Sequence, residues 1–326
     1  MDIQQNTVLR GSIRRQWEAL LLRTGLTPDT DTNQTVTLWE ADRLIAAGSR
    51  KGNLLKCITV DPEHRGEDLT AAVLSQLRSQ AFQEGHPHLF LYTKPENRML
   101  FQSLFFYPIA QTDQVLLMED RRHGIRDFLQ TLPAAAREGR IGSAVMNCNP
   151  FTLGHRHLIQ TAAKECDHVY VFVLSEEQSR FSFRDRMEMV RLGTADLPNV
   201  TILPTGPYLI SSATFPTYFL KDRDNAPQIH CQLDISIFEN HYVPHFGITH
   251  RYVGTEPLSP LTRQYNAALK QHLHSTALVE IPRLETDSTP ISASAVRAAL
   301  DAGGDIRHLV PESTYQYLIQ GGHPHG

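Results

Sequence analysis

The stretch IGSAVMNCNPFTLGHRH, residues 141–157, carries the strongest structural signal in the sequence. Its first six residues are apolar or small, which predicts a buried strand over 141–146. A polar loop follows, and the apolar spacing beyond it predicts a helix over 153–165. The first N–H groups of a helix have no partner within the helix, so a strand that runs through such a loop presents backbone donors to an anion. The stretch therefore predicts the start of an α/β fold with a candidate phosphate site.

Three residues of this stretch suit a phosphate ligand. Gly154 has no side chain, so a phosphate can approach its backbone closely. Thr152 supplies a hydroxyl donor, and His155 supplies a ring donor that can carry positive charge. Taken by itself, the same pattern also fits a plain strand–helix turn that Asn149 or Thr152 caps, with His155 on a solvated face.

The sequence beyond residue 165 continues to alternate strands and helices. Further strands are predicted over 168–174, 200–203, 229–233, 249–253 and 277–281, and further helices over 184–192, 261–273, 293–300 and 312–319. This alternation indicates a Rossmann-like parallel sheet with helices on both faces. In such sheets a ligand binds beyond the carboxyl ends of the strands, where the strand order reverses.

A second segment, ISASAVR over residues 291–297, has the composition of a ligand-binding helix start. Ser292 and Ser294 can cap the helix that follows, so that amides and hydroxyls face a phosphate chain. Arg297 lies one turn into this helix and supplies a fixed cation. Alone, the pattern is that of an ordinary N-cap, and it gains weight from the candidate site about 140 residues earlier.

The N-terminal part of the chain has a different order of elements. Helices are predicted over 13–22, 69–82 and 96–104, and strands over 35–40, 43–47, 54–60, 89–93 and 114–118. This order is that of an α+β domain. The polar run EDRRHG at 119–124 marks a seam, so we expect a domain over 1–122, a linker over 123–139 and a second domain over 140–326.

Composition excludes several classes of protein. The 326 residues are 41% hydrophobic and carry a net charge of −4, which leaves no basic field for nucleic acid or an anionic membrane. No apolar run approaches the ~20 residues that span a bilayer. The four cysteines form no CxxC pair, and the 16 histidines show no metal-binding spacing, so we expect no metal site and a cytoplasmic location.

The two segments together resemble the signatures of the nucleotidylyltransferase superfamily. The run from Thr152 to His155 matches its (His/Thr)-x-Gly-His motif, and 291–297 matches its Ile-Ser-Ser-Thr-x-Ile-Arg motif, with a departure at Ala293. The resemblance implies transfer of a nucleotidyl group from ATP with release of pyrophosphate. Mg²⁺ is expected to accompany the ATP.

The segments 179–186, 210–221, 234–241 and 251–257 resemble the citrate lyase ligase family within this superfamily. That resemblance implies activation of acetate as acetyl adenylate. The acetyl group then passes to the thiol of the CoA-derived prosthetic group on the citrate lyase acyl carrier subunit, with AMP and pyrophosphate as products. The alternatives are an adenylylating enzyme for phosphopantetheine or a mononucleotide, and an adaptor for the CoA-like arm with an inactive nucleotide site.

The resemblance also implies roles for single residues. His155 and Thr152 are expected at the α- and β-phosphates, and Ser292, Ser294 and Arg297 at the β/γ end. Lys221 is a candidate for the acetate or the α-phosphate. The remaining expected nucleotide contacts are Asn149, Phe151, Gly154, Gly254, Thr255 and Glu256. Cys148 is interpreted as a buried turn residue and not as a nucleophile, because the carrier already supplies a thiol.

In the N-terminal domain, the strand over 54–60 and the loop DPEHRGED at 61–68 resemble the pyrophosphate loop of GCN5-related N-acetyltransferases. Glu63 and Asp68 depart from that family's pattern, and two carboxylates repel a pyrophosphate. We therefore expect an acetyltransferase-like fold without independent acetyl transfer. Arg65 and Gly66 remain candidates for contact with the CoA-like arm, and the alternative is a purely structural or partner-docking domain.

Overall fold

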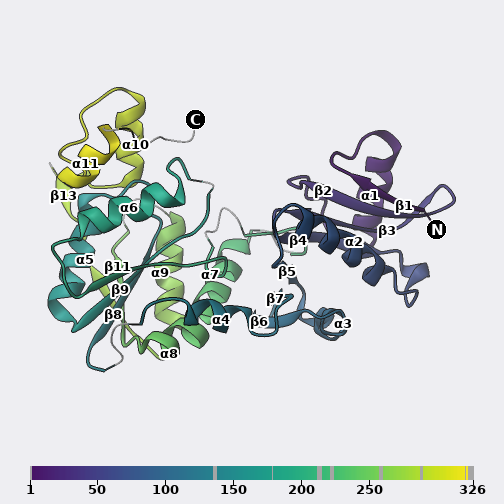
Figure 1. Ribbon diagram of the computed structural model, residues 1–326, viewed down its shortest axis with the longest axis horizontal. Coiled ribbons are helices and arrows are strands. Elements are labelled where there is room, and N and C mark those ends of the chain that lie inside the picture. Colours follow the sequence, from purple (N-terminus) through teal and green to yellow (C-terminus); the bar gives the residue numbers. More distant parts are fainter. Residues whose placement is uncertain are drawn as a thin grey trace. The chain divides into compact units, whose positions relative to one another are not determined.

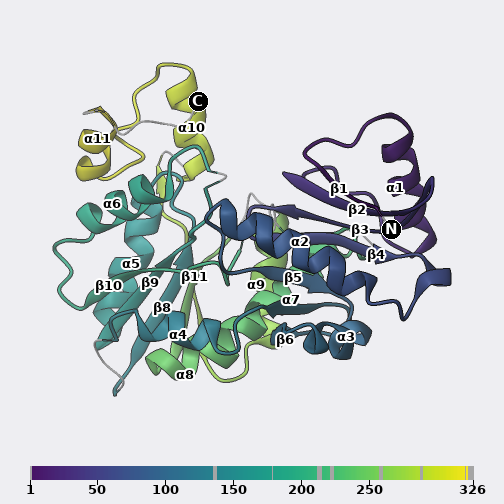
Figure 2. The ribbon, with the colours of Figure 1, turned by 45° about the vertical axis from the view of Figure 1, so that its right-hand side comes forward.

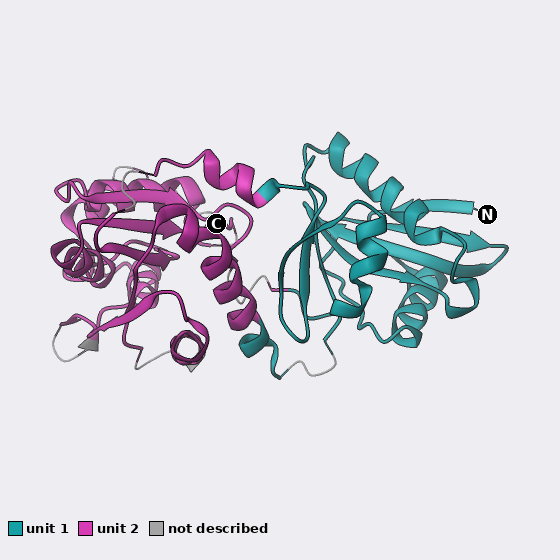
Figure 3. Cartoon of the chain, turned by 90° about the horizontal axis from the view of Figure 1, so that it is seen from below, with its two compact units in different colours: residues 1–124, 216–229 teal, residues 125–215, 230–326 magenta. Residues whose placement is uncertain are grey.

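The computed structural model describes residues 2–134, 138–177, 179–210, 215–220, 224–256, 260–286, 289–319 and 321. The chain forms two compact units, shown in Figure 3. The first unit combines Met1–Gly124 with Pro216–Ile229, and the second combines Ile125–Phe215 with His230–Gly326. A division into consecutive domains over 1–122 and 140–326 assigns residues 216–229 to the second domain. In the structure these residues belong to the first unit.

The first unit is built on a mixed seven-stranded sheet of order β1-β2-β3-β4-β5-β7-β6, in which only β4 and β5 pair in parallel among the described strands. Its strands are β1 (Asp2–Asn6), β2 (Gln34–Glu40), β3 (Arg43–Lys51), β4 (Leu54–Val60), β5 (Phe90–Thr93), β6 (Tyr107–Gln111) and β7 (Leu116–Glu119). Its helices are α1 (Gly11–Arg23), η1 (Pro62–His64), α2 (Leu69–Gln83), η2 (Pro95–Asn97) and α3 (Arg98–Ser103).

Helix α2 packs on the sheet across β2, β3 and β4 (Figure 2). Val73 and Leu77 on its apolar face are fully buried in the core of this unit. The packing is close, because a Cβ atom at Gly48 on β3 would lie 2.5 Å from Val73 Cγ1. A side chain at residue 48 would therefore force the helix away from the sheet.

Strands β4 and β5 part soon after they begin. They pair only through Leu54 and Leu55, opposite Phe90 and Leu91. Strand β4 then bulges against β3, with Cys57 at φ +53°. An extra residue in one strand bends it and increases its twist. The bulge and the short pairing together open a gap between the two strands.

The second unit contains a five-stranded parallel sheet of order β10-β9-β8-β11-β12. Its central strands β9, β8 and β11 are labelled in Figure 1. Its strands are β8 (Ile141–Met146), β9 (His168–Val173), β10 (Val200–Pro204), β11 (His250–Gly254) and β12 (Ala277–Ile281). A small hairpin, β13 (Glu285–Thr286) and β14 (Thr289–Pro290), follows. The strand order reverses between β8 and β11. The predicted fold class, an α/β unit with a Rossmann-like parallel sheet after an α+β unit, is confirmed.

The remaining helices connect and cover these strands. They are α4 (Gly124–Gln130), α5 (Leu153–Glu165), α6 (Phe183–Gly193), α7 (Ala226–Ile237), the π-helix η3 (Phe238–Tyr242), α8 (Val243–Phe246), α9 (Pro260–His272), α10 (Ala293–Asp301) and α11 (Glu312–Ile319). Within the described ranges, no helix is both long and apolar enough to cross a membrane.

The strand predicted over 229–233 is wrong, because these residues lie in α7. Ile229, Cys231 and Leu233 alternate with polar residues, which is the pattern of a half-buried strand. Ile229, Leu233 and Ile237 also recur every four residues, which is a helical spacing. Polar residues of α7 such as His230 and Asp234 are buried as well as its apolar ones. The alternation of polar and apolar residues therefore does not separate the strand period from the helix period here.

Candidate active site

A cavity of about 560 Å³ lies where β8 and β11 part. The two strands pair only through Gly142 and Ser143, opposite His250 and Arg251. Residues from the ends of both strands line the cavity, together with the first turn of α5, the middle of α9, the segment after β12 and the start of α10. This is the switch point at which open α/β sheets bind ligands.

The first turn of α5 is fixed by a reciprocal cap. The Thr152 hydroxyl accepts a hydrogen bond from His155 N at 3.3 Å, and His155 Nδ1 accepts one from Thr152 N at 3.1 Å. Such a cap stabilises a helix start by about 1 kcal/mol. It also fixes the orientation of the imidazole at the wall of the cavity.

His155 is neutral at physiological pH. Burial, and to a lesser degree the positive charge of Arg283, lowers the pKa of His155 to about 4. Since Nδ1 accepts a hydrogen bond from Thr152, the ring proton resides on Nε2. In this structure His155 is thus a neutral Nε2–H donor. The ring of Phe151 stacks behind it, with 5.9 Å between the ring centroids.

The second signature lies against the first. Ser292 caps α10 by accepting a hydrogen bond from Ala295 N at 3.1 Å. A Cβ atom built at Gly154 would lie 3.4 Å from the carbonyl oxygen of Ile291, an ordinary van der Waals contact, so the backbone of the first turn of α5 lies close to the segment that precedes α10. Thr152, the N-cap of α5, and Ser292 line the same cavity. Two helix N-termini therefore converge on one space, a strong arrangement for binding anions.

Arg297 connects the two signature segments, which lie far apart in the sequence, through a hydrogen bond. Its Nη1 donates to the carbonyl oxygen of Asn149 at 2.5 Å, and its Nη2 donates to the Ser294 hydroxyl at 3.0 Å. Arg180 in turn donates to the carbonyl oxygen of Arg297 and pairs with Asp301. Arg297 thereby holds the loop after β8 in place.

A buried arginine supports the same loop from α6. Arg186 is fully buried, and its Nη1 donates to the carbonyl oxygens of Asn147 at 2.9 Å and Leu174 at 2.7 Å. Its Nε donates to the carbonyl oxygen of Phe181 at 3.2 Å. One guanidinium therefore connects the loops that follow β8 and β9.

The end of β11 is connected to the segment after β12. Glu256 pairs with Arg283, and Arg283 Nε donates to the carbonyl oxygen of Thr255 at 2.9 Å. The carbonyl oxygen of Gly254 accepts a hydrogen bond from Asn266 on α9 at 2.9 Å. These contacts fix the wall of the cavity opposite α5.

The structure brings together part of the predicted set. The predicted residues that line the cavity are Thr152, Gly154, His155, Gly254, Glu256, Ser292 and Ser294. Four others lie behind the wall and support it, namely Asn149, Phe151, Thr255 and Arg297. Lys221 and residues 211–214 lie outside the described residues.

Sequence reasoning missed two cationic residues of the cavity, Arg283 and Arg251. The available signal for Arg283 was its position, because it comes two residues after a predicted strand. A charged residue just beyond the carboxyl end of a parallel strand, as Arg283 is, lies near the ligand of an open sheet, whereas Arg251 is the second residue of β11 and has no such signal. No motif distinguishes them from ordinary surface charges.

Cys148 lies beside the cavity, and its thiol is unsuited to nucleophilic attack. The residue is 1% exposed, and burial raises the pKa of the Cys148 thiol well above its usual range. A nucleophilic cysteine needs the opposite shift, toward the thiolate. Among the described residues, no group of three His, Cys, Asp or Glu side chains is arranged to hold a metal ion.

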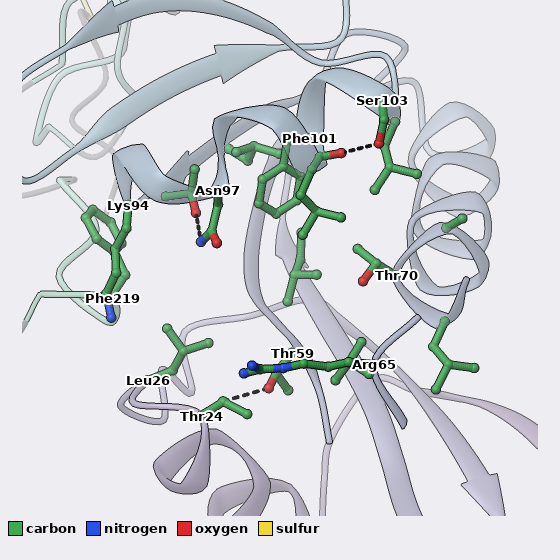
Figure 4. A pocket seen from close by; sticks show the side chains of 18 of the residues that line it. Thr24, Leu26, Thr59, Arg65, Thr70, Lys94, Asn97, Phe101, Ser103 and Phe219 are labelled. Atoms are coloured by element: carbon green, nitrogen blue, oxygen red, sulfur yellow. Dashed lines mark hydrogen bonds between the residues drawn. The ribbon is translucent and has the colours of Figure 1, made fainter. Parts of the chain in front are cut away.

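A second cavity, of about 550 Å³, lies in the first unit where β4 and β5 part. Figure 4 shows Arg65 and Thr59 on one side of it and Asn97 and Phe101 on the other. Glu63 and Asp68 do not act as a pair of free carboxylates here, because Glu63 pairs with Arg43 at 2.5 Å. The repulsion that the sequence predicts at this loop is therefore reduced.

Comparison with known proteins places the chain in a family. A model described as the citrate lyase ligase C-terminal domain matches residues 141–318. The [citrate [pro-3S]-lyase] ligases of Klebsiella pneumoniae and Escherichia coli (strain K12) are 40% and 39% identical to this chain over 305 residues. These alignments cover 90% of this chain and 89% and 86% of the relatives.

Among solved structures, a putative nicotinate-nucleotide adenylyltransferase from Vibrio parahaemolyticus is 14% identical. The superposition covers 57% of this chain and 94% of that protein, with a TM-score of 0.36. The full-length relatives and the family model agree on one assignment. The alignments with the two relatives cover 90% of the chain and so include residues of both units. The chain belongs to the citrate lyase ligase family.

Proposed function

We propose that this chain is an ATP-dependent, AMP-forming ligase that acetylates the thiol of the CoA-derived prosthetic group on the citrate lyase acyl carrier subunit. The observation that carries the proposal is the convergence of two capped helix N-termini, at Thr152 and Ser292, on one cavity. Such a cavity suits a triphosphate. Membership of the citrate lyase ligase family supports the acid and the carrier as the other substrates.

The reaction needs no enzyme nucleophile. A carboxylate oxygen of acetate attacks the α-phosphorus of ATP, the bond from that phosphorus to its bridging oxygen breaks, and pyrophosphate leaves. The carrier thiolate then attacks the acetyl carbon, and AMP leaves with the electron pair. Catalysis consists of positioning and charge stabilisation. We assign this role to the Nε2–H of His155 and to the helix N-termini capped by Thr152 and Ser292.

Mg²⁺ is proposed as a companion of the nucleotide. Among the described residues that line the cavity, the carboxylate is Glu256, and it pairs with Arg283. This donor set fits a magnesium ion that is held mainly through phosphate oxygens and water. Lys221 remains a candidate contact for the acetate or the α-phosphate.

The proposed location is the cytoplasm, because Cys57, Cys148, Cys166 and Cys231 are all free and buried. Free thiols are typical of a reducing compartment. We propose no contact with nucleic acid or membrane, consistent with the net charge of −4. The alternative, an adenylylating enzyme for phosphopantetheine or a mononucleotide, is not favoured by the relatives.

Acetate-dependent exchange of pyrophosphate into ATP tests the proposal, together with restoration of activity to deacetylated citrate lyase. We expect both with the wild-type chain, and we expect His155→Ala to lower the exchange rate by about 100-fold or more, as loss of a charge-stabilising donor does. His274→Ala, at an exposed residue, is the matched control. Exchange with phosphopantetheine or nicotinate mononucleotide but not with acetate would favour the alternative.

A further inference from the structure

Arg251 on β11 is a buried cation with unused hydrogen-bond donors. The residue is 2% exposed. Its Nε and Nη1 atoms have no hydrogen-bond partner among the described residues. These two atoms carry three N–H groups. Buried donors in native proteins are nearly always paired, so this vacancy requires a physical reason.

The neighbours of Arg251 compensate its charge only in part. Its guanidinium lies over the ring of Phe238, 4.6 Å from the ring centroid. Tyr265 and Asp234 act on it electrostatically, but in the described part of the chain Arg251 forms no ion pair with a carboxylate. The carboxylate of Asp234 accepts a hydrogen bond from the Tyr265 hydroxyl at 2.5 Å. Burial also raises the pKa of Asp234, which weakens it as a counter-charge.

The position of Arg251 connects it with the nucleotide. Arg251 and Tyr265 line the same cavity as Thr152, His155 and Ser292. Arg251 comes from the strand beside β8, and the pairing of these two strands ends at Arg251 itself. The backbone of Arg251 therefore lies at the root of the split in which the cavity opens, and the residue contributes to the cavity wall.

We infer that Arg251 binds the carboxylate of the acid substrate and presents it to the α-phosphorus. The inference rests on the proposed function and names the residue that recognises its acid. A guanidinium suits a carboxylate, because its N–H groups match the carboxylate oxygens in geometry and charge. A positive charge at this place also offsets the repulsion between the carboxylate and the phosphate that it attacks.

The role is confined to the first half of the reaction. One oxygen of the bound carboxylate forms the new bond to phosphorus, and pyrophosphate leaves with the electrons of the broken bond. The product, acetyl adenylate, no longer has a free carboxylate. Transfer of its acetyl group to the carrier thiol therefore does not need Arg251.

Steady-state exchange kinetics of Arg251→Lys and Arg251→Met test the inference. We expect the KM for acetate to rise by about 10- to 100-fold, as loss of a hydrogen bond to a charged group does, while the KM for ATP changes by less than about twofold. Lys270→Met, in the same helix as Tyr265 and paired with Glu280 at the surface, is the matched control and should behave as wild type.

A second measurement separates binding from folding. With synthetic acetyl adenylate as donor, both variants should restore activity to deacetylated citrate lyase at the wild-type rate. If the variants lost the transfer from acetyl adenylate to the carrier as strongly as they lost the exchange, Arg251 would have a structural role and the inference would be overturned. An unchanged KM for acetate would overturn it too. A wild-type chain without acetate-dependent exchange would instead overturn the proposed function itself.

Discussion

His155 is held in one protonation state by its surroundings. Nδ1 of the ring accepts a hydrogen bond from Thr152 N, and the cavity wall excludes water from much of the imidazole. The pKa of His155 is about 4 in the folded chain and about 6.5 in an unfolded one. Between these two values the unfolded state binds the extra proton, so the free energy of unfolding falls as the pH falls.

This linkage predicts a difference between the wild type and His155→Gln. Both chains should lose stability below pH 6.5, but the wild type should lose more of it between pH 6.5 and 4, because only the wild type has a buried imidazole to protonate at this position. Urea unfolding at pH 7, 5.5 and 4.5 measures the two slopes. Parallel slopes in the two chains would contradict the low pKa of His155.

At the scale of single elements, the loops after β8 and β9 depend on α6. Arg186 binds carbonyl oxygens of Asn147, Leu174 and Phe181, and a lysine cannot reach all of them. Each buried carbonyl left without a donor costs about 1–3 kcal/mol.

Arg186→Lys should therefore lower the free energy of unfolding by about 3 kcal/mol and lower the exchange rate, because the loop that precedes His155 loses its support. The matched control is Arg184→Lys, at an exposed position of the same helix. Chemical denaturation and exchange assays measure both effects. An Arg186→Lys chain as stable as the control would show that the loop is held by other contacts.

Sequence patterns predicted elements best where one signal dominated. The strand β8 and the helix α5 have the predicted bounds, because a continuous apolar run and a clear cap leave one interpretation. The helix α7 was misassigned because its residues satisfy both periods. The edge strands β1 and β6 of the first unit were not predicted, because β1 is short and mostly polar and β6 contains Pro108, a residue that is unusual within strands.

The site was predictable where its residues belong to a local motif. Caps and glycines such as Thr152, Gly154 and Ser292 have local signatures, and these residues do line the cavity. Arg251 and Arg283 come from strands whose neighbours are set by the sheet order, which no local pattern contains. Arg297 has a signature, yet its side chain holds the Asn149 loop and is not among the described lining residues.

At the scale of the whole molecule, the two cavities predict a division of labour. The cavity of the first unit holds Arg65 beside Thr59 (Figure 4), where a phosphate-bearing arm can bind. Arg65→Ala should raise the KM for deacetylated citrate lyase by about 10-fold, the effect of one charge-assisted hydrogen bond, and leave acetate-dependent exchange unchanged. The control is Arg98→Ala, at an exposed residue that is not among those lining the cavity.

A KM for the carrier that does not change in Arg65→Ala would favour a structural or docking role for the first unit. Loss of exchange in the same variant would show that the two units are coupled in the activation of acetate. The two assays together distinguish these outcomes.

The short pairing of β8 with β11, and of β4 with β5, has an evolutionary consequence. In each unit the room for a ligand comes from the path of the main chain, where two parallel strands separate after two paired residues. Side chains on the walls can therefore be exchanged by mutation while the opening persists. A scaffold of this kind can acquire a new substrate by successive replacements at the rim, without refolding its sheet.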